Sequence, residues 1–204
     1  MSIEIEKKYR LTERQRDDVL NRLPGIGAKR NGEDFEVNTL YTGETLDVTR
    51  SVLRLRRIGN RGVLTYKESL PARLDMKHRR EYETRVDDPD AMELILEALG
   101  LTPALVYEKR RETWRLGQTE IVLDELPFGL FMEVEGPEED IREVEGRLAI
   151  KRLRTEPLSY PRLVLKHGTD HDGVIESRFG KSAKKKRPAR HERTRPAQSR
   201  KQRS

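Results

Sequence analysis

Residues 3–10 of the chain read Ile-Glu-Ile-Glu-Lys-Lys-Tyr-Arg, an alternation of apolar and charged side chains that is typical of a β-strand. Because successive side chains of a strand point to opposite faces, Glu4, Glu6 and Lys8 share one face and the two isoleucines share the other. Similar alternation recurs at about 35–42, 51–58, 61–68, 79–86, 105–115, 119–125 and 129–136. Eight antiparallel strands are enough for a sheet to close into a barrel.

Helix signals separate some of these strands. Thr12 and Gln15 form a capping-box pattern ahead of a short polar helix. Asp88-Pro89 begins a second helix that ends at Gly100, and a third follows Pro137. The apolar stripes of the second and third helices need an apolar partner, which the aliphatic faces of the strands supply. We therefore predict an α+β fold, an eight-stranded antiparallel β-barrel with a charged interior and helices packed outside.

Composition excludes several classes of protein. The 204 residues contain no cysteine, which removes disulfides, thiolate metal sites and thiol nucleophiles. Charged residues make up 38% of the chain, and no stretch approaches the roughly 18 consecutive apolar residues of a membrane span. The acidic start does not resemble a secretory signal. We expect a soluble, cytoplasmic protein.

The net charge of +6 is concentrated in the last 27 residues. Residues 178–204 contain twelve Lys or Arg and one Glu, which leaves 30 basic and 35 acidic residues in 1–177. With one aromatic residue and no apolar periodicity, 178–204 is predicted to be a disordered basic tail, joined to a domain of residues 1–166 by a polar linker, 167–177. The tail is interpreted either as an arm that contacts nucleic acid or polyphosphate, or as a solubilising extension. Nothing in the sequence indicates the oligomeric state.

The charged faces of the strands form one set of seven acids and seven bases. The acids are Glu4, Glu6, Glu81, Glu83, Asp124, Glu133 and Glu135, and the bases are Lys8, Arg54, Arg56, Lys67, Arg79, Lys109 and Arg111. A charged face of this kind is ordinarily the solvent-exposed face of a sheet. Here the helices need the aliphatic faces, so we expect the charges to point into the barrel.

Three Glu-x-Glu pairs within this set indicate a metal site. Like charges two residues apart on one face of a strand raise each other's pKa unless a cation lies between them. Carboxylate clusters suit Mg²⁺ or Mn²⁺, and these ions also bind phosphates. Arg and Lys bind phosphate oxygens directly. A divalent metal with a phosphate chain would balance the charges of the predicted cavity.

The Glu-x-Glu-x-Lys motif at residues 4–8 resembles the signature of the CYTH superfamily, the triphosphate tunnel metalloenzymes. VLRLRR (52–57), LTYK (64–67), RREYE (79–83), EKRR (108–111), IVLDEL (121–126) and FMEVEG (131–136) are similar to the later motifs of that family in order and spacing. The resemblance covers about residues 2–165 and implies an eight-stranded tunnel. It also implies cleavage of inorganic triphosphate, thiamine triphosphate or nucleoside triphosphates with a divalent metal, or a class IV adenylate cyclase.

Roles for the charged residues follow from the resemblance. Glu4, Glu6, Glu133 and Glu135, with Asp124 nearby, are the implied metal ligands. Lys8, Arg54, Arg56, Lys67, Lys109 and Arg111 are the implied phosphate-binding residues, and Arg79 is assigned to the same set. Lys8, Glu81 and Glu83 are the candidate catalytic residues, the two acids as a second metal site or a water-positioning pair. Trp114 has the opposite parity to Lys109 and is expected outside the tunnel.

Three functions remain open from the sequence. The first is a metal-dependent hydrolase that releases orthophosphate from a triphosphate. The second is an adenylate cyclase. The cyclase members of the family carry a His-Phe pair ahead of the Glu-x-Glu-x-Lys motif, and the absence of this pair before Glu4 disfavours cyclase activity. The third is a non-catalytic protein that binds polyphosphate or nucleic acid through the basic tail. His167 and His171 lie four residues apart, but we expect no metal site in a polar linker.

Overall fold

The computed structural model describes residues 2–47, 50–69 and 77–180, without the side chains of residues 2–4, 69 and 77–79. An antiparallel sheet of eight long strands forms its centre. The strands are β1 (Ser2–Leu11), β2 (Lys29–Thr42), β3 (Ser51–Ile58), β4 (Arg61–Ser69), β5 (Lys77–Val86), β6 (Thr102–Leu116), β7 (Thr119–Leu126) and β8 (Gly129–Glu135). Each corresponds to a segment in which the sequence alternates, and several extend beyond the predicted ends.

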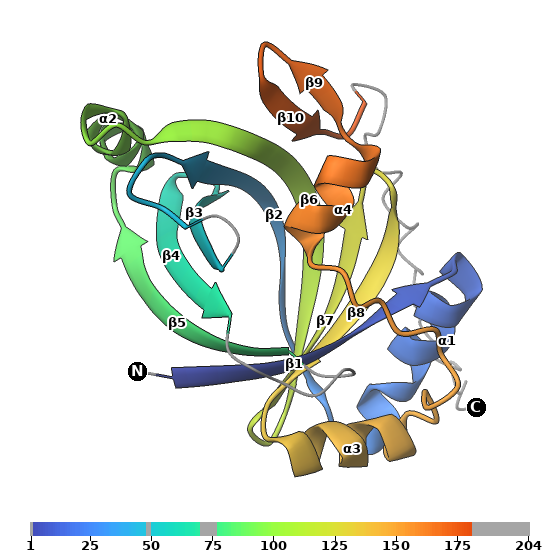
Figure 1. Ribbon diagram of the computed structural model, residues 1–204. Coiled ribbons are helices and arrows are strands. Elements are labelled where there is room, and N and C mark those ends of the chain that lie inside the picture. Colours follow the sequence, from blue (N-terminus) through green and yellow to red (C-terminus); the bar gives the residue numbers. More distant parts are fainter. Residues whose placement is uncertain (1, 48–49, 70–76, 181–204) are drawn as a thin grey trace, which may run out of the picture.

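The strands curve around a common centre (Figure 1). They pair in the order β2-β3-β4-β5-β1-β8-β7-β6. The first and last strands of this order, β2 and β6, also pair with each other. The ladders are offset along the strands, since β1 pairs with β5 over Ser2–Glu6 and with β8 over Glu6–Leu11. Stagger of this kind accompanies the tilt of strands in a barrel. The predicted antiparallel tunnel fold is confirmed.

Three predicted helices are present, α1 (Glu13–Arg22), α2 (Pro89–Ala98) and α3 (Glu138–Arg147). The capping box of Thr12 and Gln15 is formed in full at the start of α1, which is followed by a 3₁₀ turn at Pro24–Ile26. The side chain of Asp88 accepts two backbone N–H groups at the start of α2. These local signals are satisfied within a few residues, which is why the sequence locates the helices well.

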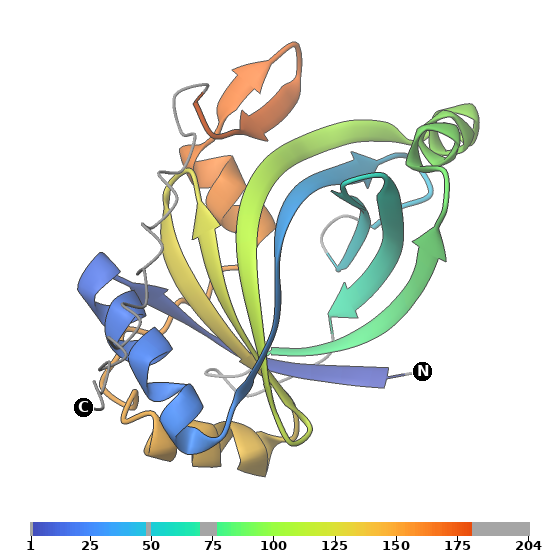
Figure 2. The same ribbon diagram turned by 180° about the vertical axis from the view of Figure 1, so that it is seen from behind.

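Several strands have an apolar outer face that is covered by helices. Outward side chains of β1, β6, β7 and β8 pack with those of α1 and α3 in one cluster that contains Tyr9, Trp114, Ile121, Val134 and Val144. Figures 1 and 2 show α1 and α3 together at one side of the barrel. A second cluster lies between β2, β3 and α2. Trp114 therefore lies outside the tunnel, as its parity predicts.

The segment expected to be a linker, 167–177, is instead ordered structure. Helix α4 (Tyr160–His167) is followed by two short strands, β9 (Thr169–His171) and β10 (Val174–Ser177). Strand β10 pairs in parallel with β6 at Leu105–Tyr107. Four residues of strand give too short an alternation to be recognised in a sequence.

The first residues of the predicted tail contact the barrel. The guanidinium of Arg110 lies 4.1 Å from the ring centroid of Phe179, and the backbone N–H of Phe179 donates to Glu108. Residues 181–204, which carry most of the predicted disorder, lie outside the described residues. In the part of the chain that is described, no helix is long and apolar enough to cross a membrane.

Candidate active site

A cavity of about 1290 Å³ lies within the curve of the sheet. Eleven of the fourteen charged residues predicted to face inward line it, namely Glu6, Lys8, Arg54, Arg56, Lys67, Glu81, Glu83, Lys109, Arg111, Glu133 and Glu135. Asp124 is buried behind this wall. The side chains of Glu4 and Arg79 are outside the described set, although the backbones of these two residues pair with each other between β1 and β5.

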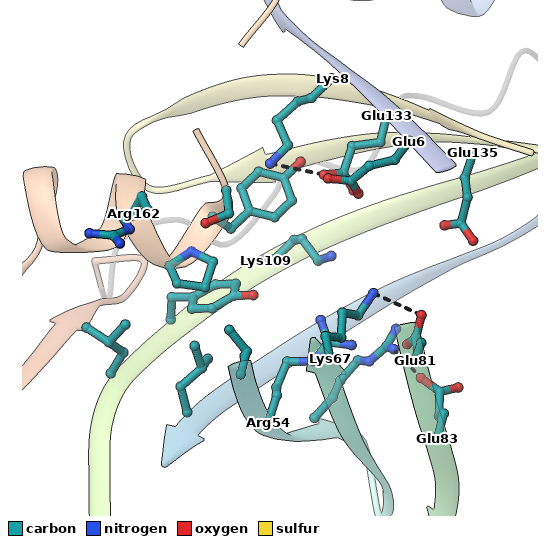
Figure 3. A pocket seen from close by; sticks show the side chains of 18 of the residues that line it. Glu6, Lys8, Arg54, Lys67, Glu81, Glu83, Lys109, Glu133, Glu135 and Arg162 are labelled. Atoms are coloured by element: carbon teal, nitrogen blue, oxygen red, sulfur yellow. Dashed lines mark hydrogen bonds and ion pairs between the residues drawn. The ribbon is translucent and has the colours of Figure 1, made fainter. Parts of the chain in front are cut away.

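Strand alternation brings these residues together. Inward positions two apart on β6 carry Lys109 and Arg111, and the inward positions of β3 carry Arg54 and Arg56. Strand β2 lies between β3 and β6 and pairs with both, so the cations of these two strands face the same part of the cavity. Figure 3 shows Lys8, Arg54, Lys67 and Lys109 around the cavity, each on a different strand.

Lys8 lies at the junction of the sheet and α4. Its Nζ is 3.1 Å from Glu133 Oε1, donates to the carbonyl of Leu158 at 3.2 Å and lies 3.6 Å from the ring centroid of Tyr160. This surrounding of carboxylate, carbonyl and aromatic face suits an ammonium group. The ammonium is thereby held at the end of the cavity that α4 covers.

Asp124 is fully engaged by neighbouring side chains. Arg111 donates to both of its oxygens, at 2.8 and 2.7 Å, and Tyr160 donates to Oδ2 at 2.7 Å. Arg111 also reaches Glu133, at 2.9 Å. Burial lowers the pKa of Arg111, but Asp124, Glu36 and Glu133 outweigh this and raise it well above its usual value. Asp124, predicted as a nearby metal ligand, in this structure orients Arg111.

Two further acids are paired with cations on the opposite wall. Lys67 Nζ lies 3.1 Å from Glu81, its direct neighbour across the β4–β5 ladder. Glu83 accepts a hydrogen bond from Arg56 at 3.2 Å and one from Thr65 at 3.1 Å. Glu83 is also partly exposed, so water reaches the carboxylate.

The remaining acids form a row across three strands. Glu6 is directly opposite Glu135 in the β1–β8 ladder, and Glu135 is opposite Glu120 in the β7–β8 ladder. All three line the cavity. Like charges directly opposite each other destabilise a sheet, so such a row suits a hard divalent cation. No group of three acidic or histidine side chains close enough to hold a metal ion is found among the described residues, which do not include the Glu4 side chain.

Sequence reasoning missed several residues of the site. Glu36 on β2 is fully buried and ion-paired with Lys109 and Arg56, and Glu120 lines the cavity. Both have the inward parity of their strands, and counting from Asp124 back to Glu120 would have found the second. Tyr160 and Arg162 also line the cavity, but they come from α4, whose position no strand pattern specifies.

Comparison with known proteins gives a consistent family assignment. The CYTH domain family matches residues 2–162. A Methanocaldococcus jannaschii protein named "Putative adenylate cyclase" is 28% identical over 69% of this chain and 81% of its own length. The solved PH1012 protein of Pyrococcus horikoshii is also 28% identical, with a TM-score of 0.67 over 78% of this chain and 98% of its own.

A plant structure has the same fold at lower identity. HpAC1 of Hippeastrum, described as having a dominant triphosphatase activity, is 17% identical, with a TM-score of 0.63 over 86% of this chain and 100% of its own. The match to the CYTH domain family extends from the Glu-x-Glu-x-Lys motif of β1 to the first residues of α4, which line the cavity. The chain therefore belongs to the CYTH domain family.

Proposed function

We propose that this protein is a metal-dependent hydrolase that releases orthophosphate from a triphosphate compound. The observation that carries the proposal is the cavity itself, in which cations from β1, β3, β4 and β6 face a row of carboxylates from β1, β7 and β8. A triphosphate chain carries negative charge along its length, and the cation set matches it. Membership in the CYTH family supports the same class of substrate.

The cations bind and orient the substrate in this proposal. Lys8, Arg54, Arg56, Lys67, Lys109 and Arg111 contact phosphate oxygens and stabilise the charge that spreads over the γ-phosphoryl group in the transition state. The Arg side chains are held in fixed directions by Asp124, Glu133, Glu83 and Thr65. Because these contacts exist before substrate arrives, little reorganisation is needed at the moment of reaction.

The acids divide into two groups. Glu6 and Glu135, with Glu4 and Glu133, would hold Mg²⁺ or Mn²⁺, and Glu120 lies in the same row. When bound, such an ion neutralises phosphate charge and lowers the pKa of bound water. Glu81 and Glu83 would orient the attacking water. The water oxygen adds to the γ-phosphorus, the bond to the bridging oxygen breaks and leaves that oxygen on the diphosphate, and a carboxylate takes the water's proton.

An assay of three substrates tests this function. Inorganic triphosphate, thiamine triphosphate and ATP are incubated with the folded protein and Mg²⁺ or Mn²⁺, and orthophosphate release is measured. We expect release from at least one substrate, with activity lost on chelation and restored by the metal. No release from any of the three would refute the proposal.

The relative from Methanocaldococcus jannaschii favours cyclase activity as a second candidate. The same ATP reactions distinguish the two, because a cyclase forms cyclic AMP and pyrophosphate, whereas a hydrolase forms orthophosphate and ADP. Product analysis by chromatography therefore decides between them.

A further inference from the structure

Glu36 is a buried carboxylate surrounded by the cations of the cavity wall. Its exposed fraction is 1%. Lys109 Nζ lies 3.2 Å from Oε2, Arg56 Nη1 lies 3.5 Å from Oε1 and Arg111 Nε lies 3.8 Å from Oε1. The buried amide of Asn38 donates to Oε2 at 3.3 Å. One acid thus contacts three of the residues assigned to phosphate binding.

The position of β2 explains this arrangement. Glu36 is directly opposite Lys109 in the β2–β6 ladder, and on the other side of β2 Asn38 is opposite Arg56 of β3. Glu36 and Asn38 are two residues apart and share the inward face. The carboxylate therefore lies between the two strands that supply most of the arginines and one lysine of the cluster.

Glu36 lies behind the cations. Arg56, Lys109 and Arg111 are on the cavity wall, whereas Glu36 is not among the residues that line it. Burial alone would raise the pKa of Glu36, but Lys109, Arg111, Arg56 and Arg54 lower it far below its usual value. The carboxylate is thus a fixed negative charge on the protein side of the cluster, with the substrate on the other side.

We propose that Glu36 is a positioning residue and a built-in counterion, which holds Arg56, Lys109 and Arg111 toward the cavity and weakens their attraction for phosphate anions. The effect on turnover rests on the proposed triphosphatase function, whereas the effect on anion affinity does not. Asp124 accepts from Arg111 and lies 3.6 Å from Lys109 Nζ, so two of the three cations keep a second acid when Glu36 is replaced.

The fixed negative charge of Glu36 affects the release of product as well as the binding of substrate. Cations that bind substrate, transition state and products equally well lower KM without raising kcat. A diphosphate or orthophosphate product meets the same cations as the substrate, and an internal carboxylate reduces the net charge that retains it. Glu36 therefore favours turnover over tight binding.

The test compares wild type with Glu36→Gln and Glu36→Asp, and uses Glu145→Gln as a matched control. Glu145 is also buried and accepts from a lysine and a tyrosine, but it belongs to α3, outside the tunnel. Calorimetry gives the Kd of metal-free inorganic triphosphate and of pyrophosphate, and steady-state kinetics gives KM and kcat.

Glu36→Gln is expected to lower the Kd of both anions by about tenfold, since one charge close to the cluster is removed in a medium of low dielectric constant. KM falls with it, while kcat also falls because the cations lose their alignment and product leaves slowly. Glu36→Asp keeps the charge, so Kd stays at the wild-type value while kcat drops. The Glu145→Gln control leaves Kd, KM and kcat unchanged.

Unchanged Kd and KM in Glu36→Gln, with only a loss of thermal stability, would make Glu36 a structural ion pair and overturn the inference. If Glu36→Gln does not fold, Glu36→Asp decides, because a Kd far from the wild-type value would show that retained charge does not set affinity. If wild type hydrolyses no triphosphate, the proposed function fails, while the Kd comparison still tests the role of Glu36.

Discussion

Lys7 and Lys8 are neighbours on β1, and each is ion-paired with a glutamate, yet the two pairs lie on opposite sides of the barrel wall. Lys7 Nζ is 2.8 Å from Glu145 of α3, in the shell between strands and helices. Lys8 Nζ is 3.1 Å from Glu133, at the cavity. The outer pair joins a helix to the sheet, whereas the inner pair faces the place where substrate would bind.

The difference shows that the position of a residue along the strand, and not its type, decides whether its side chain faces the helices or the cavity. Outside, Glu145 is enclosed by Tyr9 and Lys7, which satisfy it locally. Inside, Glu133 shares its partners with a network that also contains Arg111 and Asp124. A substitution outside should therefore change stability, and a substitution inside should change catalysis.

The largest expected effect is at Lys8. Lys8→Gln removes a cation from the cavity wall, and we expect kcat/KM for the best triphosphate substrate to fall by about 10²–10³-fold, as when one stabilising donor is lost from an active site. Lys7→Gln is the matched control and should retain wild-type kinetics. Equal losses in the two variants would break the distinction between inner and outer faces.

Glu135 tests the acidic row. Glu135→Gln should reduce kcat/KM at a fixed Mg²⁺ or Mn²⁺ concentration by about 100-fold through weaker metal binding. Raising the metal concentration should restore part of the loss. The fold should remain intact, because removing a like charge opposite Glu6 and Glu120 relieves repulsion in the metal-free protein. Full activity at low metal would contradict a metal role for this residue.

Glu145 gives the converse result on the outer face. Glu145→Gln replaces the carboxylate that accepts from Lys7 and Tyr9 with a neutral amide, and we expect the free energy of unfolding to fall by about 2 kcal/mol. Denaturant unfolding measures the loss. The value of kcat/KM at a temperature where the variant is folded should equal that of wild type, and a tenfold drop would show that the two faces are coupled.

The smallest effect on turnover is expected from removing the basic tail. Truncation after Gly180 keeps Phe179 and its contacts with Arg110 and Glu108, so the barrel should be undisturbed. We expect kcat and KM to be unchanged, while salt-sensitive binding to RNA or polyphosphate decreases. Lost turnover in the truncated protein would show that the tail takes part in catalysis and would contradict an enzyme confined to the barrel.

Much of the fold could be predicted because it depends on neighbours in the sequence. Alternation identifies β1 and the other long strands, and the capping residues Thr12 and Asp88 begin α1 and α2. The structure of the C-terminal region could not be predicted in this way. The pairing of β10 with β6 joins residues about 70 positions apart over only three residue pairs, and no local pattern encodes it.

The candidate site divides in the same way. Charged residues on well-recognised strands, such as Arg54 and Lys109, were found from parity together with the family resemblance. Glu36 was missed because it is the one charged residue of the predicted segment 35–42, and its role depends on partners from β3 and β6. Tyr160 and Arg162 come from a helix whose place beside the cavity depends on tertiary packing.

The sequence by itself determined which side of each strand is charged, since alternation is a property of consecutive residues. Only the tertiary structure decided which charges meet, that Asp124 orients Arg111, that Glu36 lies behind the cations and that α4 covers Lys8. The physical reason is that burial and ion pairing depend on distances between strands. Those distances are set by the curvature and stagger of the whole sheet, and no single segment of the chain determines these properties.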